Sequence, residues 1–442
     1  MRLMGFINSS DYIGLKMELE KYNVVDIADF LETLKQDKMV LVFRLLPKDM
    51  SAEVFSYLTS NQQQYLIESI TDSEIRYLLN GLFVDDAVDL LEEVPASMVK
   101  KILENINDEK RVLINQYLKY KSDSAGSIMT SEFVELGLKN TVKEAIDIIK
   151  KTGSNKETVY TCYVKNNERK LVGIVPLRTL MFESDEILVE DVMTTKIISI
   201  TTNEDQEVVA DMIRKYDLLS LPVVDSENRL VGIITVDDAM DVIEEENTED
   251  FEKMAAISPS ENEYLRTGVW ELARNRIVWL LILMLSATIT GSIISYFEDT
   301  LAAMIILTTF IPMLTDTGGN AGSQSATLVI RGLALGEIKT GDFLKVLWKE
   351  FRVSLICGLI LSVVNFLRLV YISKVGIGIA FVVCITIALT VVIAKLVGGV
   401  LPIGAKKLGF DPALMASPLI TTIVDSIVLV LYFYVASIVL GI

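Results

Sequence analysis

Histidine is absent from this 442-residue chain, and its three cysteines, Cys162, Cys357 and Cys384, are far apart in sequence. The chain therefore lacks the imidazole and thiolate sets that hold Zn2+ or Cu2+, and it lacks the His or Cys pairings of most nucleophilic enzymes. Any bound metal has to be held mainly by oxygen, which favours hard ions such as Mg2+ and Ca2+. The isolated cysteines provide no disulfide framework, as in proteins of a reducing cytosol. We expect a protein that is not an enzyme.

Charge is scarce in the second part of the chain. The sequence is strongly acidic up to about Arg276 and apolar afterwards, so the formal net charge of −18 describes neither part. The acidity argues against nucleic acid as a partner and for a cation. The acidic part is long enough for more than one domain of about 100 to 150 residues. A soluble regulator fused to a membrane unit is the organisation that this division predicts.

Five apolar stretches are long enough to cross a bilayer, which takes about 20 residues. They lie near 277–296, 301–330, 351–370, 377–401 and 416–440. Most basic residues cluster in connections that the positive-inside rule then places in the cytoplasm, although Arg368 and Lys374 run against this orientation. The pattern predicts a multi-pass protein of the cell membrane, with a cytoplasmic N-terminal half and the C-terminus outside.

Asp425 is the one formal charge in the last span, and a carboxylate at bilayer depth is costly enough that function is the default explanation. The second span carries Asp316 and a polar, glycine-rich string at 317–325, where backbone can come close to a small solute. Together these two spans suggest a cation pore.

Each of these features has a structural alternative. Gly318 and Gly319 can serve close helix packing, because small residues let membrane helices approach each other. Asp425 can form a buried pair with Lys395, which we otherwise expect to reach the membrane interface as an anchor.

An internal repeat of about 60 residues lies in the acidic part. Ser-Ile-Met-Thr at 127–130 recurs as Asp-Val-Met-Thr at 191–194, and Leu-Val-Gly-Ile at 171–174 recurs at 230–233. Each unit reads as a small α/β module with a hairpin beside helices. The pair resembles tandem CBS domains. Such pairs often bind adenine nucleotides and often serve only in dimerisation, so the ligand stays open.

The first 122 residues show helical periodicity and almost no strand signal, which predicts an all-α domain. Asp85, Asp86 and Asp89 open one of its helices. Capping and a favourable position in the helix dipole explain them as readily as ion binding does.

Taken in order, these parts resemble the MgtE family of Mg2+ channels over essentially the whole chain. The most specific motifs are the Gly-Gly-Asn-Ala-Gly-Ser-Gln-Ser-Ala-Thr-Leu string at 318–328, Asp-Pro-Ala-Leu at 411–414 and Thr-Thr-Ile-Val-Asp at 421–425. The resemblance implies a homodimer with Mg2+ as the transported and the regulatory ion. It implies a multi-domain fold with an all-α N-terminal domain, an α/β tandem CBS pair and an α-helical transmembrane domain with five spans. The corresponding ranges are 1–122, 123–186 and 187–250 for the two CBS units, 251–275 for an amphipathic plug helix, and 276–442 for the pore domain.

The pore residues that the resemblance implies lie in the second and last spans. The family's pore carboxylate falls on Asp425, and a family asparagine is replaced here by the shorter Ser417. Thr421 is assigned no role, and Asp316 matches no family site. The predicted pore residues are Asp425, Gly318, Gly319, Asn320 and Ser417. Two copies of Asp425 on one axis would attract a hydrated divalent ion, whose water would bond to backbone carbonyls freed near the glycines.

A row of carboxylates ends the second CBS unit. Asp238, Asp241, Glu245 and Glu249 follow one another at helical steps, so like charges stack on one surface and repel. We expect cytosolic Mg2+ to bridge such carboxylates and hold the plug helix closed, and low Mg2+ to release it. The residues predicted to hold regulatory Mg2+ are Asp85, Asp86, Asp89, Asp205, Glu207, Asp217, Asp238, Asp241, Glu246, Glu249, Asp250 and Asp411. The alternative for any one of them is a solvated surface charge.

Two other functions stay open at this point. One is a broader divalent cation transporter or exporter for ions such as Co2+ or Mn2+. The other is a nucleotide-sensing, CBS-regulated transporter of another solute, although an anion would require basic groups at bilayer depth, where only Lys395 qualifies.

Overall fold

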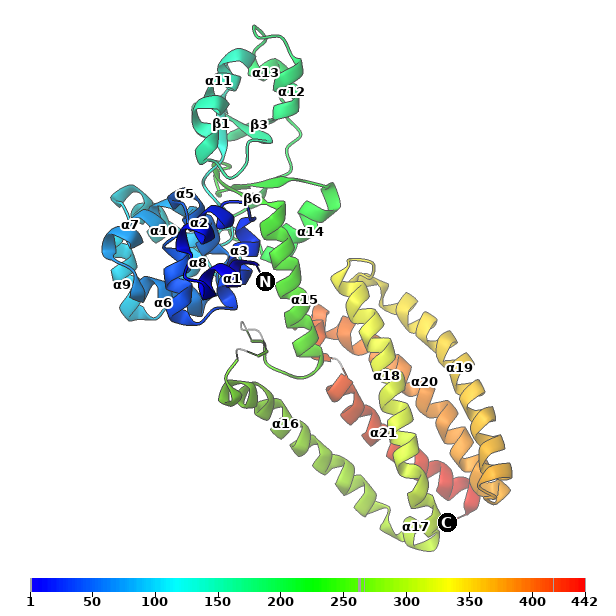
Figure 1. Cartoon of the computed structure of the whole chain (residues 1–442). Helices are drawn as coiled ribbons and strands as arrows, with labels where there is room; N and C mark the ends of the chain where they lie inside the picture. The colour runs from blue at the N-terminus through cyan, green and yellow to red at the C-terminus, as the bar shows by residue number, and fades with distance from the viewer. Residues whose placement is uncertain (1, 261–263, 266, 416, 442) are drawn as a thin grey trace. The chain divides into compact units, whose positions relative to one another are not determined.

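The computed structural model describes residues 2–260, 264–265, 267–415 and 417–441 (Figure 1). The chain divides into two compact units, Met1–Glu244 and Glu245–Ile442. The long helix α15 (Val236–Met254) belongs to both units, because it begins in the first and ends in the second.

Ten short helices form the N-terminal part of the first unit, as predicted. They are α1 (Arg2–Asn8), α2 (Tyr12–Leu19), α3 (Val24–Glu32), α4 (Gln36–Phe43), α5 (Lys48–Ser56), α6 (Ser60–Ser69), α7 (Asp72–Gly81), α8 (Val84–Glu93), α9 (Ala96–Asn105) and α10 (Asp108–Tyr117). From α3 onward each helix packs against the one two places along the chain, so the domain is a short superhelix.

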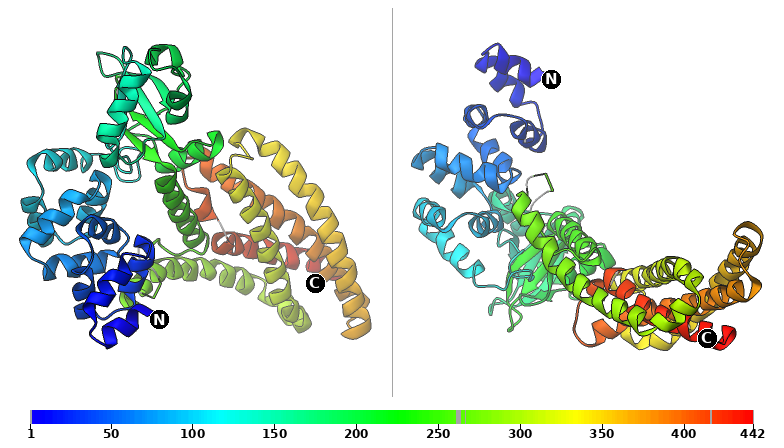
Figure 2. Two further views of the ribbon diagram at one scale, coloured as in Figure 1. Left: turned by 45° about the horizontal axis from the view of Figure 1, so that its top comes forward. Right: turned by 90° about the horizontal axis from the view of Figure 1, so that it is seen from below.

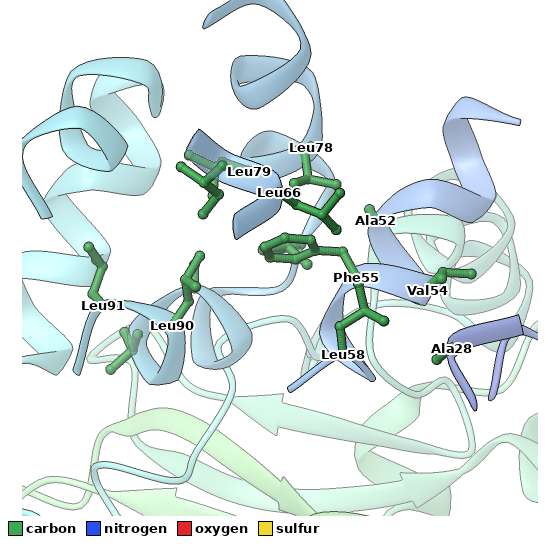
Figure 3. Close-up of a cluster of buried hydrophobic side chains, with 14 of the residues drawn as sticks. Ala28, Ala52, Val54, Phe55, Leu58, Leu66, Leu78, Leu79, Leu90 and Leu91 are labelled. Atoms are coloured by element: carbon green, nitrogen blue, oxygen red, sulfur yellow. The ribbon is translucent and has the colours of Figure 1, made fainter. Parts of the chain in front are cut away.

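The superhelix closes around a continuous apolar core. Phe55 of α5 is fully buried and lies among leucines of neighbouring helices, including Leu66, Leu79 and Leu90 (Figure 3). Polar side chains cap the start of several of these helices. Thr71, for example, begins α7 with a capping box in which its hydroxyl and the Glu74 carboxylate satisfy each other's backbone N–H groups.

The repeat predicted from sequence appears as two three-stranded sheets with one topology. The strands are β1 (Val134–Gly137), β2 (Thr161–Lys165) and β3 (Leu171–Pro176) in one sheet, and β4 (Ile200–Thr201), β5 (Ser220–Val224) and β6 (Leu230–Thr235) in the other. In both sheets the first strand pairs parallel with the second, and the second pairs antiparallel with the third. The accompanying helices are α11 (Val142–Thr152), α12 (Leu177–Phe182), α13 (Val189–Val192) and α14 (Gln206–Tyr216). The predicted α/β duplication is confirmed.

The two sheets exchange their Met-Thr segments. Thr130, which precedes the first sheet, bridges to Ile233 of β6, and Thr194 bridges to Ile174 of β3. A Cβ added at Gly232 would lie 2.6 Å from Met129 Sδ and 2.9 Å from the Thr130 carbonyl oxygen. Only glycine leaves room for this crossing, which explains why Met-Thr and Leu-Val-Gly-Ile occur as a linked pair of motifs.

We expect Gly232→Ala to destabilise the protein by about 1 to 3 kcal/mol, because the added methyl group would press on backbone as well as on a flexible methionine. The thermal unfolding midpoint of the purified full chain in detergent should fall. Gly5→Ala in α1 is a matched control, since nothing lies within 4 Å of the added Cβ. Equal midpoints for the two variants would contradict this account of the crossing.

All described secondary-structure elements of the second unit are helices. They are α16 (Val269–Tyr296), α17 (Glu298–Ala303), α18 (Ile311–Ala334), α19 (Phe343–Leu367), α20 (Ile377–Lys407) and α21 (Ser417–Leu440), with 3-10 turns before α18, α19 and α21. Helix α20 packs against α18, α19 and α21, and α16 packs along α21 (Figure 2). The apolar core of the second unit includes Val391, Val424 and Val428.

Four segments in the described part of the chain are long and apolar enough to cross a membrane. They are Val269–Tyr296, Thr340–Ile372, Ile377–Lys407 and Pro412–Leu440. The second predicted span, 301–330, is not among them: it begins as the short α17 and a 3-10 turn, and the continuous helix α18 starts only at Ile311. The polar string at 317–325 lowers the apolar character of that helix.

A separate helix over 251–275 is not found in the described residues. Helix α15 instead carries the acidic row on to Met254, and α16 starts at Val269. Pro259 lies between them, and proline disfavours helix at its own position and at the residue before it.

Candidate functional site

The glycines of α18 face the neighbouring helices. A Cβ at Gly318 would lie 2.8 Å from Val424, one at Gly319 would lie 3.0 Å from Thr421, and one at Gly322 would lie 2.7 Å from Ile420. Close helix packing is therefore confirmed for Gly318 and Gly319. The helix is continuous from Ile311 to Ala334, so the expectation that carbonyls are freed from the helix near these glycines is wrong.

Asp425 lies half-buried near the centre of α21. Its Oδ1 is enclosed and has no hydrogen-bond partner among the residues that the structure describes. The alternative of a buried pair with Lys395 is wrong, because the Lys395 ammonium donates to Ser325 Oγ instead. The expected interfacial anchor is also wrong, since Lys395 is buried among the helices.

Asp316 and Asn320 lie one turn apart on the exposed face of α18. Asp316 lies close enough to Asp425 for its charge to act on the Asp425 carboxylate. Two carboxylates so placed, one of them with an unpartnered oxygen, attract a cation and repel an anion. The side chain of Ser417, the remaining predicted pore residue, lies outside the described part of the chain.

A second group of carboxylates gathers within the first unit. Asp85 and Asp86 stand in the first turn of α8, and Asp238 stands in the first turn of α15. Glu132 and Glu157, from loops of the first CBS unit, act electrostatically on Asp85 together with Asp238. We call these five residues the buried acidic cluster: each side chain is half-buried, and Asp85 and Glu157 each have a fully enclosed carboxylate oxygen.

Two oxygens of this cluster lack partners. Asp85 Oδ1 and Glu157 Oε2 are buried and accept no hydrogen bond from the described residues. Lys110 is a nearby cation, but its ammonium donates to the carbonyl oxygens of Leu79 and Leu82. Buried carboxylates with spare lone pairs and excess negative charge are suited to an oxygen-preferring cation.

Burial and mutual repulsion shift the titration of the cluster. Burial, with repulsion from Asp86 and Asp238, raises the pKa of Asp85 well above its usual value. Burial raises the pKa of Asp86 to about 6 and that of Glu157 to about 7. Burial also raises the pKa of Asp238, although hydrogen bonds from Thr235 oppose the shift. The ionised cluster is therefore a source of instability unless a cation compensates it.

These raised pKa values predict a pH dependence without divalent cations. A carboxylate whose pKa is higher in the folded protein than in the unfolded chain stabilises the fold fully at low pH, and that stability is lost as the pH rises through its folded pKa. The thermal midpoint of the purified protein in chelator should therefore fall as the pH rises from about 4 to about 7, between the unfolded and the folded pKa values of Asp86 and Glu157. The double variant Asp86→Asn, Glu157→Gln should flatten the curve, and a slope as steep as that of the wild type would refute this assignment.

The other predicted regulatory residues divide into three sets. Asp205 caps α14, where its Oδ1 accepts from the Glu207 N–H at 3.0 Å, and Asp217 ends the same helix in a left-handed conformation with φ 52°. Asp89 and Asp241 each lie one turn beyond the cluster, on the exposed faces of α8 and α15. The third set, Glu246, Glu249, Asp250 and Asp411, lies in the second unit.

Glu249, Asp250 and Asp411 surround Lys253 in the second unit. The Lys253 ammonium lies 2.6 Å from Glu249 Oε1 and 2.7 Å from Asp411 Oδ2. Burial, with repulsion from Asp411, raises the pKa of Asp250. Glu246 precedes this group by one turn of α15. Lys253 provides a counter-charge to Glu249 and Asp411.

Sequence reasoning missed Glu132 and Glu157. Both lie in loops outside any acidic run, so only the folded arrangement associates them with Asp85. Within the described residues no three carboxylate, thiol or imidazole side chains are already drawn together as a metal ligand set. The cluster offers charge and unpartnered oxygens, and its side chains would have to move to surround an ion.

Comparisons with known proteins agree with this organisation. Residues 311–435 match the family model described as divalent cation transporter, 22–123 match the MgtE intracellular N domain, and 125–186 and 189–245 match the CBS domain. The magnesium transporter MgtE of Thermus thermophilus is 35% identical over 99% of this chain and 98% of its own length. That of Bacillus subtilis is 33% identical over 93% of both chains.

A solved structure matches the N-terminal part. The crystal structure of the cytosolic domain of the Mg2+ channel MgtE in complex with ATP aligns with a TM-score of 0.53 and 32% identity, covering 54% of this chain and 98% of that one. The relatives are named as transporters, and the matched family models describe transport and regulatory domains. The chain belongs to the MgtE family of divalent cation transporters.

Proposed function

We propose that this protein is a Mg2+ channel of the cell membrane that cytosolic Mg2+ closes. The observation that carries the transport part is Asp425, whose Oδ1 has no partner among the described residues and whose carboxylate feels the charge of Asp316. Mg2+ holds its water tightly, so a sparse set of carboxylates and polar groups suits the hydrated ion. The names of the two full-length relatives support Mg2+ as the ion.

Helix α18 is the fifth membrane helix in this proposal. Its 24 residues correspond to about 36 Å of helix, which exceeds the bilayer core of about 30 Å. Its exposed Asp316 and Asn320 would be costly against lipid. A second copy of the chain is the partner that would cover them, and the homodimer would place two copies of Asp425 around one path. With five spans and a cytoplasmic N-terminal half, the C-terminus lies outside.

The regulatory part rests on the buried acidic cluster. Cytosolic Mg2+ that binds Asp85, Glu157 and Asp238 stabilises the compact form of the first unit, because a ligand that binds one state shifts the equilibrium towards it. Helix α15 starts at this cluster and ends among Glu249, Asp250 and Lys253, so both acidic groups bear on one element. The solved relative's complex with ATP supports an adenine nucleotide as a further ligand of the CBS pair.

Uptake into vesicles tests the ion. Purified protein in lipid vesicles should take up Mg2+, and an organic solute should not compete. Co2+ is the informative competitor: equal transport of Co2+ and Mg2+ would favour the broader divalent transporter. If no Mg2+ crosses the vesicle membrane under an inward or an outward Mg2+ gradient, the proposal is refuted.

A further inference from the structure

Lys395 is a charged side chain enclosed by the helices of the second unit. It lies in α20 and is 6% exposed. Among the described residues its ammonium makes one hydrogen bond, to Ser325 Oγ at 3.5 Å. An ammonium carries three donors, and a charge at membrane depth is costly and is usually retained for a function. The cation path proposed above has no use for this positive charge.

Ser325 connects Lys395 to a third helix. The serine lies in α18 and is 1% exposed, and its hydroxyl donates to Glu350 Oε2 of α19 at 2.6 Å. An ammonium only donates, a carboxylate only accepts, and a hydroxyl has one hydrogen. The chain of hydrogen bonds therefore runs in one direction, from ammonium to hydroxyl to carboxylate. It compensates a positive charge with a negative one and joins α20, α18 and α19.

This connection lies beside the closest approach of α18 and α20. A Cβ added at Gly398 would lie 2.2 Å from the Gly322 carbonyl oxygen, and one at Gly399 would lie 3.1 Å from Glu350 Cγ. The two backbones are thus in direct contact next to the hydrogen-bonded chain. Any sliding of α18 along α20 has to break the chain and to disturb this contact.

We propose that Lys395, Ser325 and Glu350 form a positioning lock for the ion path. The lock fixes α18 against α20 and thereby sets where Asp316 stands relative to Asp425. These are positioning residues, since none of them contacts the ion in this scheme. The inference rests on the proposed function, because it takes Asp316 of α18 and Asp425 of α21 as parts of the path.

The test compares ion discrimination with folding. Ser325→Ala cuts the chain at its centre, and the ratio of Mg2+ to Co2+ uptake into vesicles should change by about threefold or more, because displaced carboxylates discriminate ions differently. Ser325→Thr keeps the hydroxyl and should keep the ratio. Ser354→Ala is the matched control, since that buried hydroxyl donates only within its own helix, to the Phe351 carbonyl at 2.7 Å. A merely structural role would reduce both uptakes equally and leave the ratio unchanged.

A double variant covers the case in which single variants fold poorly. Glu350→Gln alone leaves the buried Lys395 ammonium without its counter-charge, and Lys395→Met alone leaves the half-buried Glu350 carboxylate without its own. The two changes together leave neither charge. The double variant should recover the thermal midpoint that each single variant loses, while its Mg2+ to Co2+ ratio stays altered. Additive losses in midpoint, or a wild-type ratio in the folded double variant, would overturn the lock. If the wild type itself carries no Mg2+, the proposed function fails. If the wild type carries Mg2+ but the variants leave the Mg2+ to Co2+ uptake ratio unchanged, the lock alone fails.

Discussion

Asp425→Ala is expected to reduce Mg2+ flux by about 100-fold or more. Unit charges about 4 Å apart interact by about 4 kcal/mol at an effective dielectric constant of about 20, and about 1.4 kcal/mol corresponds to a factor of ten. Losing this carboxylate removes the one formal charge of α21 from the path. The measurement is Mg2+ uptake into vesicles, normalised to the amount of folded protein.

Two further variants sharpen this experiment. Asp425→Asn keeps hydrogen bonding and loses the charge, so strong residual flux would show that contacts with water dominate over Coulomb attraction. Ser426→Ala is the matched control at the next position of α21, where the hydroxyl donates to the Thr422 carbonyl of its own helix. It should carry Mg2+ like the wild type. Wild-type flux in Asp425→Ala would refute the pore assignment.

The second large effect concerns inhibition by cytosolic Mg2+. Neutralising four members of the buried acidic cluster, with Asp85→Asn, Asp86→Asn, Glu157→Gln and Asp238→Asn, should leave the channel active at high cytosolic Mg2+. The reason is that bridging by a divalent ion acts at contact distance, whereas salt at about 0.15 M weakens repulsion between exposed charges beyond about 8 Å. Patch recording at low and high cytosolic Mg2+ measures the effect.

The opposite sign is also informative. If repulsion within the cluster is what opens the gate, removing the charges favours the compact form, and flux falls at every Mg2+ concentration. The matched control neutralises four exposed acids that connect the two CBS units, Glu183, Asp185, Glu186 and Glu190, which changes the net charge equally. Unaltered inhibition in the cluster variant would place the sensor elsewhere, with the group around Lys253 as the next candidate.

The sequence predicted the domain order because its signals are local. Helical periodicity in residues 1–122 and the repeated Met-Thr and Leu-Val-Gly-Ile motifs each lie within one element or one unit. The regulatory site was harder to predict from sequence, because only tertiary packing brings Glu132 and Glu157 near Asp85. Asp205 and Asp217 begin and end α14, and their role in ion binding stays a prediction.

The membrane unit shows the same division between local and tertiary information. Asp425 was recognisable because a single charge in an apolar run needs no partner to be unusual. Lys395 was misread as an anchor, since its burial depends on Ser325 of one helix and Glu350 of another. Of the two interpretations of Gly318 and Gly319, close packing of α18 and α21 is confirmed, whereas the freed carbonyls are not found in the continuous helix.

The exchange of Met-Thr segments between the two CBS sheets has a consequence for how the pair unfolds. Each sheet borrows an edge contact from sequence that belongs to its neighbour, through Thr130 with Ile233 and Thr194 with Ile174. Opening of either half would break both bridges and expose the strand that each bridge covers. The two halves should therefore behave as a single cooperative unit in hydrogen exchange. A chain shortened by one repeat would therefore lose both sheets. A ligand that stabilises one half against opening should stabilise the other half to the same extent.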